Sequence, residues 1–443
     1  MVTVVMSILL VAMVLGLAFE EVIHAKKSVI TGVTAVVVVL LGAVFGVFPE
    51  ELSHVHHVPV YVLTINWEVI TIILGASLFV DITSKSGIFS WIALWLTRFS
   101  QGDPVRLLVF YGVMTVLFSA TLNNVAAMLI VGSLTKVSLD KLGRNQMLLG
   151  FLMTEAMLTN VGGLLTLISS VPNIIVGKRA GIAYVEFFLK AAPYTVVATA
   201  VTLGMAAWLF RIRPLASDEE KRSAKELVDS FEPADAITSK GFFWFSAVMF
   251  VLFVITLSLT SVIPYVSELG MGFVALAFAF AMLVRFKSTA HEKYAALDWD
   301  LLFFFSTLFI VVEVMAFAGV LDVIGGGIEQ LVALGDTGGP MALLAAAALA
   351  SSVTDNIPLA AVLAEILHGL PTIEEQPNLW WSVILGANLG GNITPIGSAS
   401  TVVGMTIMHK AQLDISFVGF MKKAAPFAVV HIALACVYVL FLA

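Results

Sequence analysis

The sequence predicts an all-α membrane protein that crosses the bilayer many times and is made of two homologous halves. Of its 443 residues, 60% are hydrophobic and only 12% are charged, and the mean hydropathy is +1.02. A soluble domain has about 45–50% apolar and about 25% charged residues. Several apolar stretches reach the roughly 20 residues that a helix needs to cross a bilayer. In addition, one sequence pattern occurs once in each half of the chain.

Apolar stretches of membrane-spanning length occur along the whole chain, for example Thr31 to Phe48, Leu107 to Val131 and Ala191 to Phe210. At about 20 residues a span, roughly ten to twelve spans are expected. The first stretch, Val2 to Phe19, has no basic residue before it and no small-residue cleavage site after it, so we expect a retained span rather than a signal peptide. With its compact loops, the chain is expected to be a multi-pass protein of the cell (inner) membrane.

Charge and cysteine content exclude several classes of function. The 23 basic and 30 acidic residues form no basic patch of the kind that binds nucleic acid. Cys436 is the single cysteine, which rules out an internal disulfide and a thiolate cluster for a soft metal. No GxxxxGK[ST] phosphate loop is present, so an ion gradient is the expected energy source. No Ser/His/Asp arrangement indicates an enzyme, and no cofactor is expected besides Na⁺ or H⁺ as coupling ions.

One polar segment, Arg211 to Lys240, divides the chain almost in half. Its mixed charges and prolines cannot lie in hydrocarbon. We therefore predict a first membrane repeat over residues 1–210, a polar linker over residues 211–240 and a second membrane repeat over residues 241–443. We expect the linker to lie in the cytoplasm.

The repeat is visible as a constant offset between the halves. An offset of 232 residues aligns Trp67 with Trp299 and, without a gap, four further pairs: Asp81 with Glu313, Gly87 with Gly319, Asn123 with Asp355, and Asn124 with Asn356. After one small deletion the offset is 228, where TNVGGLLTLISS (Thr159 to Ser170) lies over ANLGGNITPIGS (Ala387 to Ser398). A duplicated membrane unit is typical of secondary transporters, whose substrate site lies where the repeats meet.

Polar residues interrupt one apolar stretch in each half, at Asn123 and Asn124 and at Thr354, Asp355 and Asn356. Thr, Asp and Asn are common helix N-cap residues. Each half is therefore predicted to contain a broken helix, whose free backbone groups are tolerated in a membrane only where they line a cavity. The alternative is a structural kink with satisfied caps.

A glycine-rich segment follows each of these interruptions and predicts a second break in each half. Glycine permits close backbone approach and positive φ, while neighbouring amides and hydroxyls supply oxygen ligands. The alternative is tight helix packing through small residues, which accounts for the glycines but not for the polar residues beside them. The candidate ion-binding residues here are Asn160, Gly162, Ser169, Ser170 and Asn173 in the first half and Asn388, Asn392, Thr394 and Ser398 in the second.

Four carboxylates in apolar surroundings are candidates for proton coupling: Asp81, Glu155, Glu313 and Asp355. A carboxylate inside a membrane protein can hold a proton in one state and a cation in another. Asp355 is the strongest candidate and the predicted Na⁺ ligand, because it lies within a break, whereas its repeat mate Asn123 is neutral. For Asp81 and Glu313 the alternative is a solvated helix end, and for Glu155 it is a structural role.

Three motifs carry a resemblance to a known family: TNVGG (Thr159 to Gly163), TDNIP (Thr354 to Pro358) and GANLGGNITPIGSASTVV (Gly386 to Val403). Over nearly its whole length the chain resembles the ion transporter superfamily, in particular the branch of arsenite permeases, NhaD-type sodium/proton antiporters and the P protein. The resemblance implies two inverted repeats in which two re-entrant hairpins meet two broken helices. It also implies a homodimer and an elevator-type motion, and it places residues 123, 124, 355 and 356 at the hairpin tips.

These observations predict a secondary transporter of a small inorganic ion. The leading interpretation is exchange of Na⁺ for H⁺, with Asp355 binding each in turn and with amide and backbone oxygens completing the sodium shell. The alternative is a permease for arsenite, silicate or another small anion or neutral oxyacid, which the helix N-termini at Asn124 and Asn356 would face. An ion channel, the third interpretation, would need a continuous pore. Because Asn123 is neutral where the P protein group has an acidic residue, a site with two carboxylates is not assumed.

Overall fold

The computed structural model describes residues 2–49, 58–122, 124–260, 263–354, 356–371, 373–395 and 397–442. These residues form helices and loops without a strand, so the predicted all-α multi-pass class is confirmed. Within them, eight helices are long and apolar enough to cross a membrane, fewer than the ten to twelve spans expected. The numbers differ partly because some apolar stretches are divided into shorter helices.

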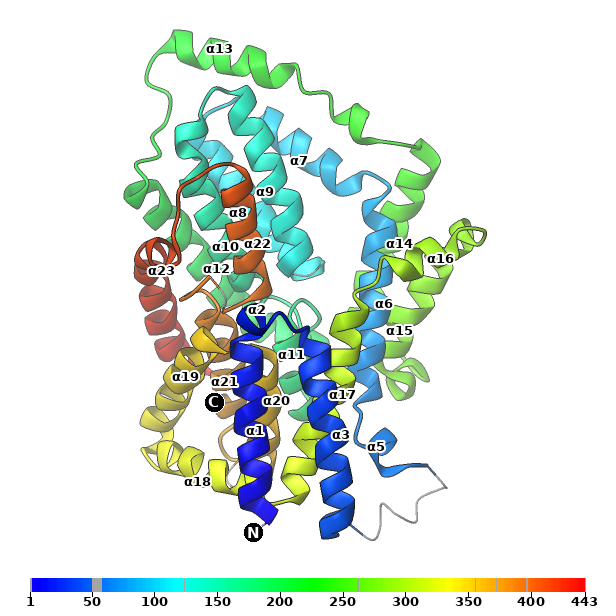
Figure 1. The fold of residues 1–443 in the computed structure, drawn as a ribbon. Helices are drawn as coiled ribbons and strands as arrows, with labels where there is room; N and C mark the ends of the chain where they lie inside the picture. Colours follow the sequence, from blue (N-terminus) through cyan, green and yellow to red (C-terminus); the bar gives the residue numbers. More distant parts are fainter. Residues whose placement is uncertain are drawn as a thin grey trace.

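The helices follow one another through Figure 1 from blue to red. Those of the first half are α1 (Val2–Ala18), α2 (Glu20–Ile23), α3 (Lys27–Phe45), α5 (Val60–Leu63), α6 (Trp67–Ser84), α7 (Ile88–Phe99), α8 (Pro104–Thr121), α9 (Asn124–Lys141), α10 (Leu148–Gly162), α11 (Val171–Arg179) and α12 (Tyr184–Leu209). After α13 (Asp218–Asp229) come α14 (Lys240–Ser258), α15 (Val266–Leu283), α16 (Ala290–Ala295), α17 (Trp299–Phe317), α18 (Val320–Val332), α19 (Gly335–Val353), α20 (Asn356–Gly369), α21 (Asn378–Gly390), α22 (Ala399–Lys410) and α23 (Phe417–Tyr438).

Four long helices form two pairs, each of which joins a helix of the first half to one of the second. Helix α6 packs along α15, where a Cβ atom added to Gly75 would lie 2.5 Å from the backbone carbonyl carbon of Ala275. Helix α3 packs along α17, where Thr31 and Thr307 share a hydrogen bond of 2.6 Å. Small residues allow membrane helices to approach closely. The two halves are therefore interlocked through these pairs, which lie to the right of centre in Figure 1.

Helices α6 and α17, which the sequence aligns with one another, have the same kind of start and finish. The side chains of Asn66 and Asp298 each accept a hydrogen bond from the backbone N–H three residues further on, at 3.2 and 3.0 Å. Soon after the helices end, Gly87 and Gly319 adopt φ values of 83° and 69°. Glycine reaches this left-handed region without the steric cost that a side chain brings. The aligned positions thus share local structure, while the repeat boundaries remain a prediction.

The polar segment between α12 and α14 is folded against the rest of the protein. Ser217 caps α13, which lies across the top of the molecule in Figure 1. The Leu215 N–H donates to the Asp103 carboxylate at 3.0 Å. Ala224 of α13 lies over Gly102, where an added Cβ would come within 2.8 Å of the alanine side chain. The linker is therefore attached to the corner between α7 and α8.

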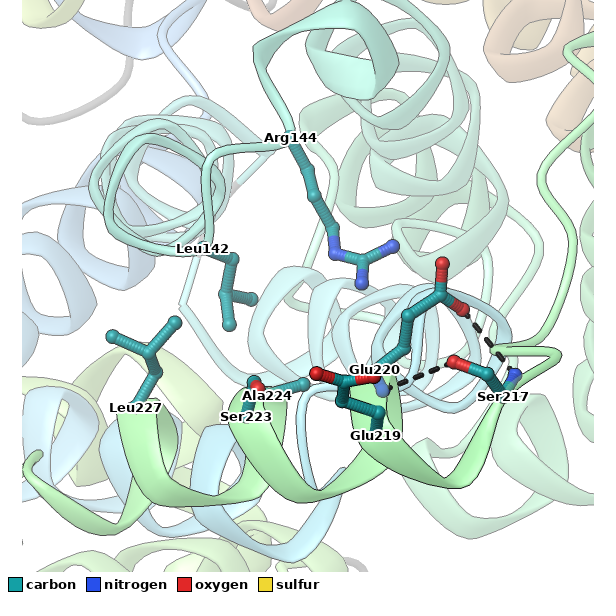
Figure 2. A pocket seen from close by; sticks show the side chains of 8 residues that line it. All are labelled: Leu142, Arg144, Ser217, Glu219, Glu220, Ser223, Ala224 and Leu227. Carbon is teal, nitrogen blue, oxygen red and sulfur yellow. Dashed lines mark hydrogen bonds between the residues drawn. The ribbon is translucent and has the colours of Figure 1, made fainter.

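Figure 2 shows the pocket that α13 forms with the loop after α9. Arg144 extends into it from that loop and points toward Glu220, while Glu219 lies on the same side of α13. None of the residues predicted to bind an ion lines this pocket. It is a feature of the linker and lies apart from the breaks in the membrane helices.

Glycines allow the hairpins and the broken helices to touch backbone to backbone. A Cβ atom on Gly390 would lie 2.2 Å from the carbonyl oxygen of Ala348 and 2.7 Å from the Cβ of Ser351. In the first half, a Cβ atom on Gly162 would lie 2.7 Å from the backbone of Val116. Gly162, predicted as an ion-binding residue, therefore has a packing role in this structure.

Replacing Gly390 by alanine is expected to lower the stability of the protein by about 1–3 kcal/mol, because the added methyl group meets a backbone that cannot turn aside. Gly204→Ala in α12 is the matched control, since nothing lies within 4 Å of that position. There the change is expected to be neutral or to stabilise the helix by up to about 1 kcal/mol. Thermal unfolding of the purified protein in detergent measures both, and wild-type unfolding of Gly390→Ala would contradict the contact.

Candidate ion-binding site

Both hairpin breaks predicted from the sequence are present. In the first half, α8 ends at Thr121 and α9 begins at Asn124, and Leu122 after α8 has non-helical φ and ψ values of −98° and −112°. In the second half, α20 begins at Asn356 after Thr354, which is extended with φ −126° and ψ 162°. Asn123 and Asp355, the central residues of the two breaks, lie outside the described residues. The structure thus places the rims of both predicted sites, and the roles of these two residues remain predictions.

The glycine-rich segments form the second pair of breaks, between α10 and α11 and between α21 and α22. Ser170 and Ser398 are extended, with φ values of −138° and −150°, immediately before α11 and α22. The Ser169 hydroxyl and the Asn173 amide both donate to the carbonyl of Gly163, at 2.7 and 2.6 Å. These two predicted site residues therefore stabilise the backbone of the break between α10 and α11.

Each hairpin is attached to the broken helix of its own half by two hydroxyl groups. The bonds of the first half are matched one for one, at the expected offsets, by bonds of the second half. Each has a donor–acceptor distance of 2.6 Å: Ser119 to the carbonyl of Thr159, Thr166 to that of Ala120, Ser351 to that of Ala387, and Thr394 to that of Ser352. Hairpin and broken helix therefore form one unit in each half.

The two broken helices also contact one another through a matched pair of bonds. The Asn160 amide donates to the Ser398 hydroxyl at 3.0 Å, and the Ser170 hydroxyl donates to the Asn388 carbonyl oxygen at 2.6 Å. All four side chains are buried. Since the offset of 228 exchanges the two bonds, this contact is self-complementary in the way that two-fold interfaces are.

The matched contact is extended differently on its two sides, and the larger group lies around Asn160. Its side-chain oxygen accepts hydrogen bonds from Asn124 and from Ser400, both at 3.2 Å. Its amide also donates to Asn392 at 2.8 Å, whereas the repeat mate of Asn392 is the apolar Leu164. We call Asn124, Asn160, Asn392, Ser398 and Ser400 the Asn160 cluster. The predicted residues Ser170, Asn173 and Asn388 lie together on the other side, where the Asn388 amide donates to Asn173 at 2.9 Å.

Ser400 and Ser119 belong to this arrangement but were not predicted from the sequence. Ser119 donates to the Asn124 side chain at 2.7 Å, so it positions the residue that opens α9. Ser119 lies one helical turn before the first break and Ser400 lies in the first turn after the last one. Their sequence signal is a hydroxyl residue within one helical turn of a predicted break.

The described carboxylates differ in their surroundings. Asp81 lies in the last turn of α6 and forms an ion pair with Lys85 at 2.8 Å. Glu313 is partly buried in α17, near the ion pair of Arg179 with Glu365. Glu155 is 1% exposed and forms no ion pair with a described residue. Within the described part of the chain, no three His, Cys, Asp or Glu side chains are grouped so that they could hold a metal ion.

Asp81→Asn is expected to change the stability by less than about 1 kcal/mol, because an exposed ion pair contributes little. The side chains of Asp81 and Lys85 are 31% and 41% exposed. We also expect any cation-driven proton flux to stay within about two-fold of the wild type, since water can replace this partner. Glu186→Gln, which breaks a similar exposed pair with Lys190 in α12, is the matched control. A proton flux lost in Asp81→Asn alone would instead support its predicted role in proton coupling.

The fold and the buried centre define the class of protein. A multi-pass chain whose halves each attach a hairpin to a broken helix, and whose two broken helices meet in a buried polar centre, is a membrane transporter. Residues 17–386 match the family described as citrate transporter (CitMHS), and the chain belongs to that family. This description was not predicted from the sequence, whereas the relationship to the branch that includes the P protein is confirmed.

Several proteins are similar to this chain. An uncharacterized transporter of Mycobacterium tuberculosis is 31% identical over 381 residues, which cover 84% of this chain and 86% of the relative. The human P protein is 25% identical, over 97% of this chain and 59% of its own length. The YdaH transporter of Alcanivorax borkumensis, described as having an unusual topology, matches with a TM-score of 0.66 at 14% identity, over 94% of this chain and 98% of its own.

A second solved structure is similar as well. MtrF of Neisseria gonorrhoeae, described as illuminating a class of antimetabolite efflux pumps, has a TM-score of 0.55 at 14% identity, over 84% of this chain and 80% of its own. At this level of identity the two structures establish a shared fold.

Proposed function

We propose that the chain is a secondary active transporter that exchanges Na⁺ for H⁺. One observation carries the proposal: the first hairpin break, through Asn124, and the broken helices of both halves meet in a largely buried group of amides and hydroxyls, the Asn160 cluster. Na⁺ is a hard cation that prefers oxygen ligands, and unwound backbone at helix breaks supplies them in transporters. Asp355, between α19 and α20, would add the negative charge and bind Na⁺ and H⁺ in turn.

We further propose an elevator-type movement, in which α8–α12 and α19–α23 move as one body. The four hydroxyl bonds that attach the hairpins to the broken helices support this division. The pairs α6–α15 and α3–α17 would form the stationary part. The ion pair of Lys178 in α11 with Glu68 in α6 joins the two parts and would have to break during the movement. Domain motions of this kind take microseconds to milliseconds.

A specific feature supports a second candidate, the transport of a small anion. Helices α9, α11, α20 and α22 all begin at a break, and helix N-termini attract negative charge. No described carboxylate bonds to the Asn160 cluster. The description of the family as citrate transporter and the alternative of an arsenite or silicate permease belong to this candidate.

Reconstituted vesicles distinguish the two candidates. The purified protein is placed in proteoliposomes that contain a pH-sensitive dye and an acidic interior, and Na⁺, Li⁺ or K⁺ is added outside. The proposal expects Na⁺ to make the interior more alkaline, while K⁺ and protein-free liposomes show no such change. If no cation moves protons and the vesicles instead take up citrate or arsenite in a saturable way, the anion candidate replaces the proposal.

The proposal also includes a homodimer in the cell (inner) membrane and no cofactor besides the coupling ions. Light scattering of the purified protein in detergent measures the mass of the assembly. Twice the mass of one chain is expected, and the mass of a single chain would contradict the dimer.

A further inference from the structure

Glu155 carries a buried carboxyl group to which the proposed exchange assigns no role. It lies on α10, five residues before Asn160, and is 1% exposed. Its Oε1 atom accepts a hydrogen bond from the Thr135 hydroxyl. Its Oε2 atom is buried and has no hydrogen-bond partner within the described part of the chain.

The surroundings of Glu155 are neutral. Helix α8 presents Tyr111 to it and α9 presents Thr135, while Tyr111 shares hydrogen bonds with Thr97 and Ser138. Helix α21 carries no titratable residue. The other titratable residues of the elements packed against α10 have no hydrogen bond or electrostatic interaction with Glu155: Arg106, Lys136, Asp140, Lys141, Arg144, Tyr184, Glu186, Lys190, Tyr194, His409, Lys410, Lys422, Lys423, His431, Cys436 and Tyr438.

These surroundings favour a proton as the ligand. An ionised carboxylate that is buried without a cation is costly, so the side chain is most stable here as the neutral acid. Among the described residues the Thr135 hydroxyl is the one hydrogen-bond partner of the carboxyl group, and Oε2 has none, so the side chain is not fixed in a structural network. The repeat mate of Glu155 is Val383, which is also buried. The equivalent position of the second half therefore holds an apolar side chain, so packing of the repeat unit does not itself require a carboxyl group there.

We propose that Glu155 carries a second proton in the exchange, in addition to the proton that alternates with Na⁺ at Asp355. On release, the O–H bond breaks, the electron pair stays on the carboxylate, and the proton passes to water or to the neighbouring hydroxyls. The negative charge that remains lies on the helix that carries Asn160, where it favours an arriving Na⁺. Two protons then move for each Na⁺, which makes the exchange electrogenic. This inference rests on the proposed Na⁺/H⁺ exchange.

The test is the proton-to-sodium ratio of Glu155→Gln in proteoliposomes. At zero membrane potential, the pH gradient that just stops a given Na⁺ gradient from moving protons gives the ratio. The wild type is expected to give two protons per Na⁺ and Glu155→Gln one, so the balancing pH gradient is twice as large in the variant. The flux of the variant should also lose its dependence on membrane voltage. Glu186→Gln on α12, where the exposed side chain pairs with Lys190, is the matched control, with an expected ratio of two.

Each outcome decides the inference. Equal ratios in wild type and Glu155→Gln, a ratio of one in the wild type, or a ratio lowered to the same extent by Glu186→Gln would overturn it and leave the Na⁺/H⁺ exchange standing. A wild type that moves no protons with Na⁺ would overturn the proposed function and this inference together. If Glu155→Gln does not fold, Thr135→Val replaces it. Because the ionised carboxylate then loses its donor, the pH at which the ratio falls from two to one should rise, and an unchanged pH would overturn the inference.

Discussion

Replacing Asp355 by asparagine is expected to lower Na⁺-driven proton flux at least about 100-fold, which corresponds to about 2.7 kcal/mol. At the four hairpin-tip positions named by the family resemblance, Asp355 is the single acidic residue, since Asn123, Asn124 and Asn356 are amides. Asparagine keeps the size and an oxygen ligand but can neither take up a proton nor balance the charge of Na⁺. The variant makes the second break chemically like the first, where Asn123 occupies the matching position.

The flux is measured with the pH-sensitive dye in proteoliposomes. Asp322→Asn, in the exposed first turn of α18, is the matched control and is expected to behave like the wild type. Asp355→Glu keeps the charge on a longer side chain and should retain part of the flux. Wild-type flux in Asp355→Asn would remove this residue from the mechanism and favour the anion candidate.

Asn160→Ala is expected to have the second largest effect and to abolish transport of whichever ion the site binds. The change removes four hydrogen bonds, to Asn124, Asn392, Ser398 and Ser400. Each buried polar group left without a partner costs about 1–3 kcal/mol. The partners belong to both halves, so the loss also loosens the contact between the two broken helices. We expect a lower unfolding temperature together with the loss of transport.

The matched control for this variant is Asn378→Ala. Asn378 is also buried, at the start of α21, but its side-chain oxygen has no hydrogen-bond partner in the described structure. Uptake of radioactive Na⁺ and thermal unfolding are measured for both. Equal effects of the two changes would show that Asn160 matters only as a buried asparagine and not as the centre of the cluster.

The sequence predicted the breaks and most of the cluster because the repeat marks them. Asn160 and Ser398 lie in segments that align at an offset of 228, and the structure joins them directly. The polar residues of such segments are visible from the sequence, since they interrupt long apolar stretches and polar groups in hydrocarbon are costly.

Other features depend on contacts that a single sequence does not reveal. The pairing of α3 with α17 brings Thr31 into hydrogen-bond contact with Thr307, and the sequence of neither helix indicates that the other is its partner. The isolation of Glu155 results from neutral faces of α8 and α9, whereas Asp81 has Lys85 one helical turn away on the same helix. The sequence alone does not distinguish the two carboxylates, whereas the structure shows that their surroundings differ. Among the described residues, eight helices reach spanning length where ten to twelve spans were expected, partly because broken helices divide apolar stretches.

The most direct test of the account is sodium accumulation driven by a pH gradient. Proteoliposomes of the wild-type protein are prepared with equal Na⁺ concentrations on both sides and an acidic interior, and entry of radioactive Na⁺ is followed. The account predicts that Na⁺ rises inside above its outside concentration until the pH gradient is spent, and that Asp355→Asn shows no rise. Equal Na⁺ on both sides throughout, with an intact pH gradient, would contradict Na⁺/H⁺ exchange by this protein.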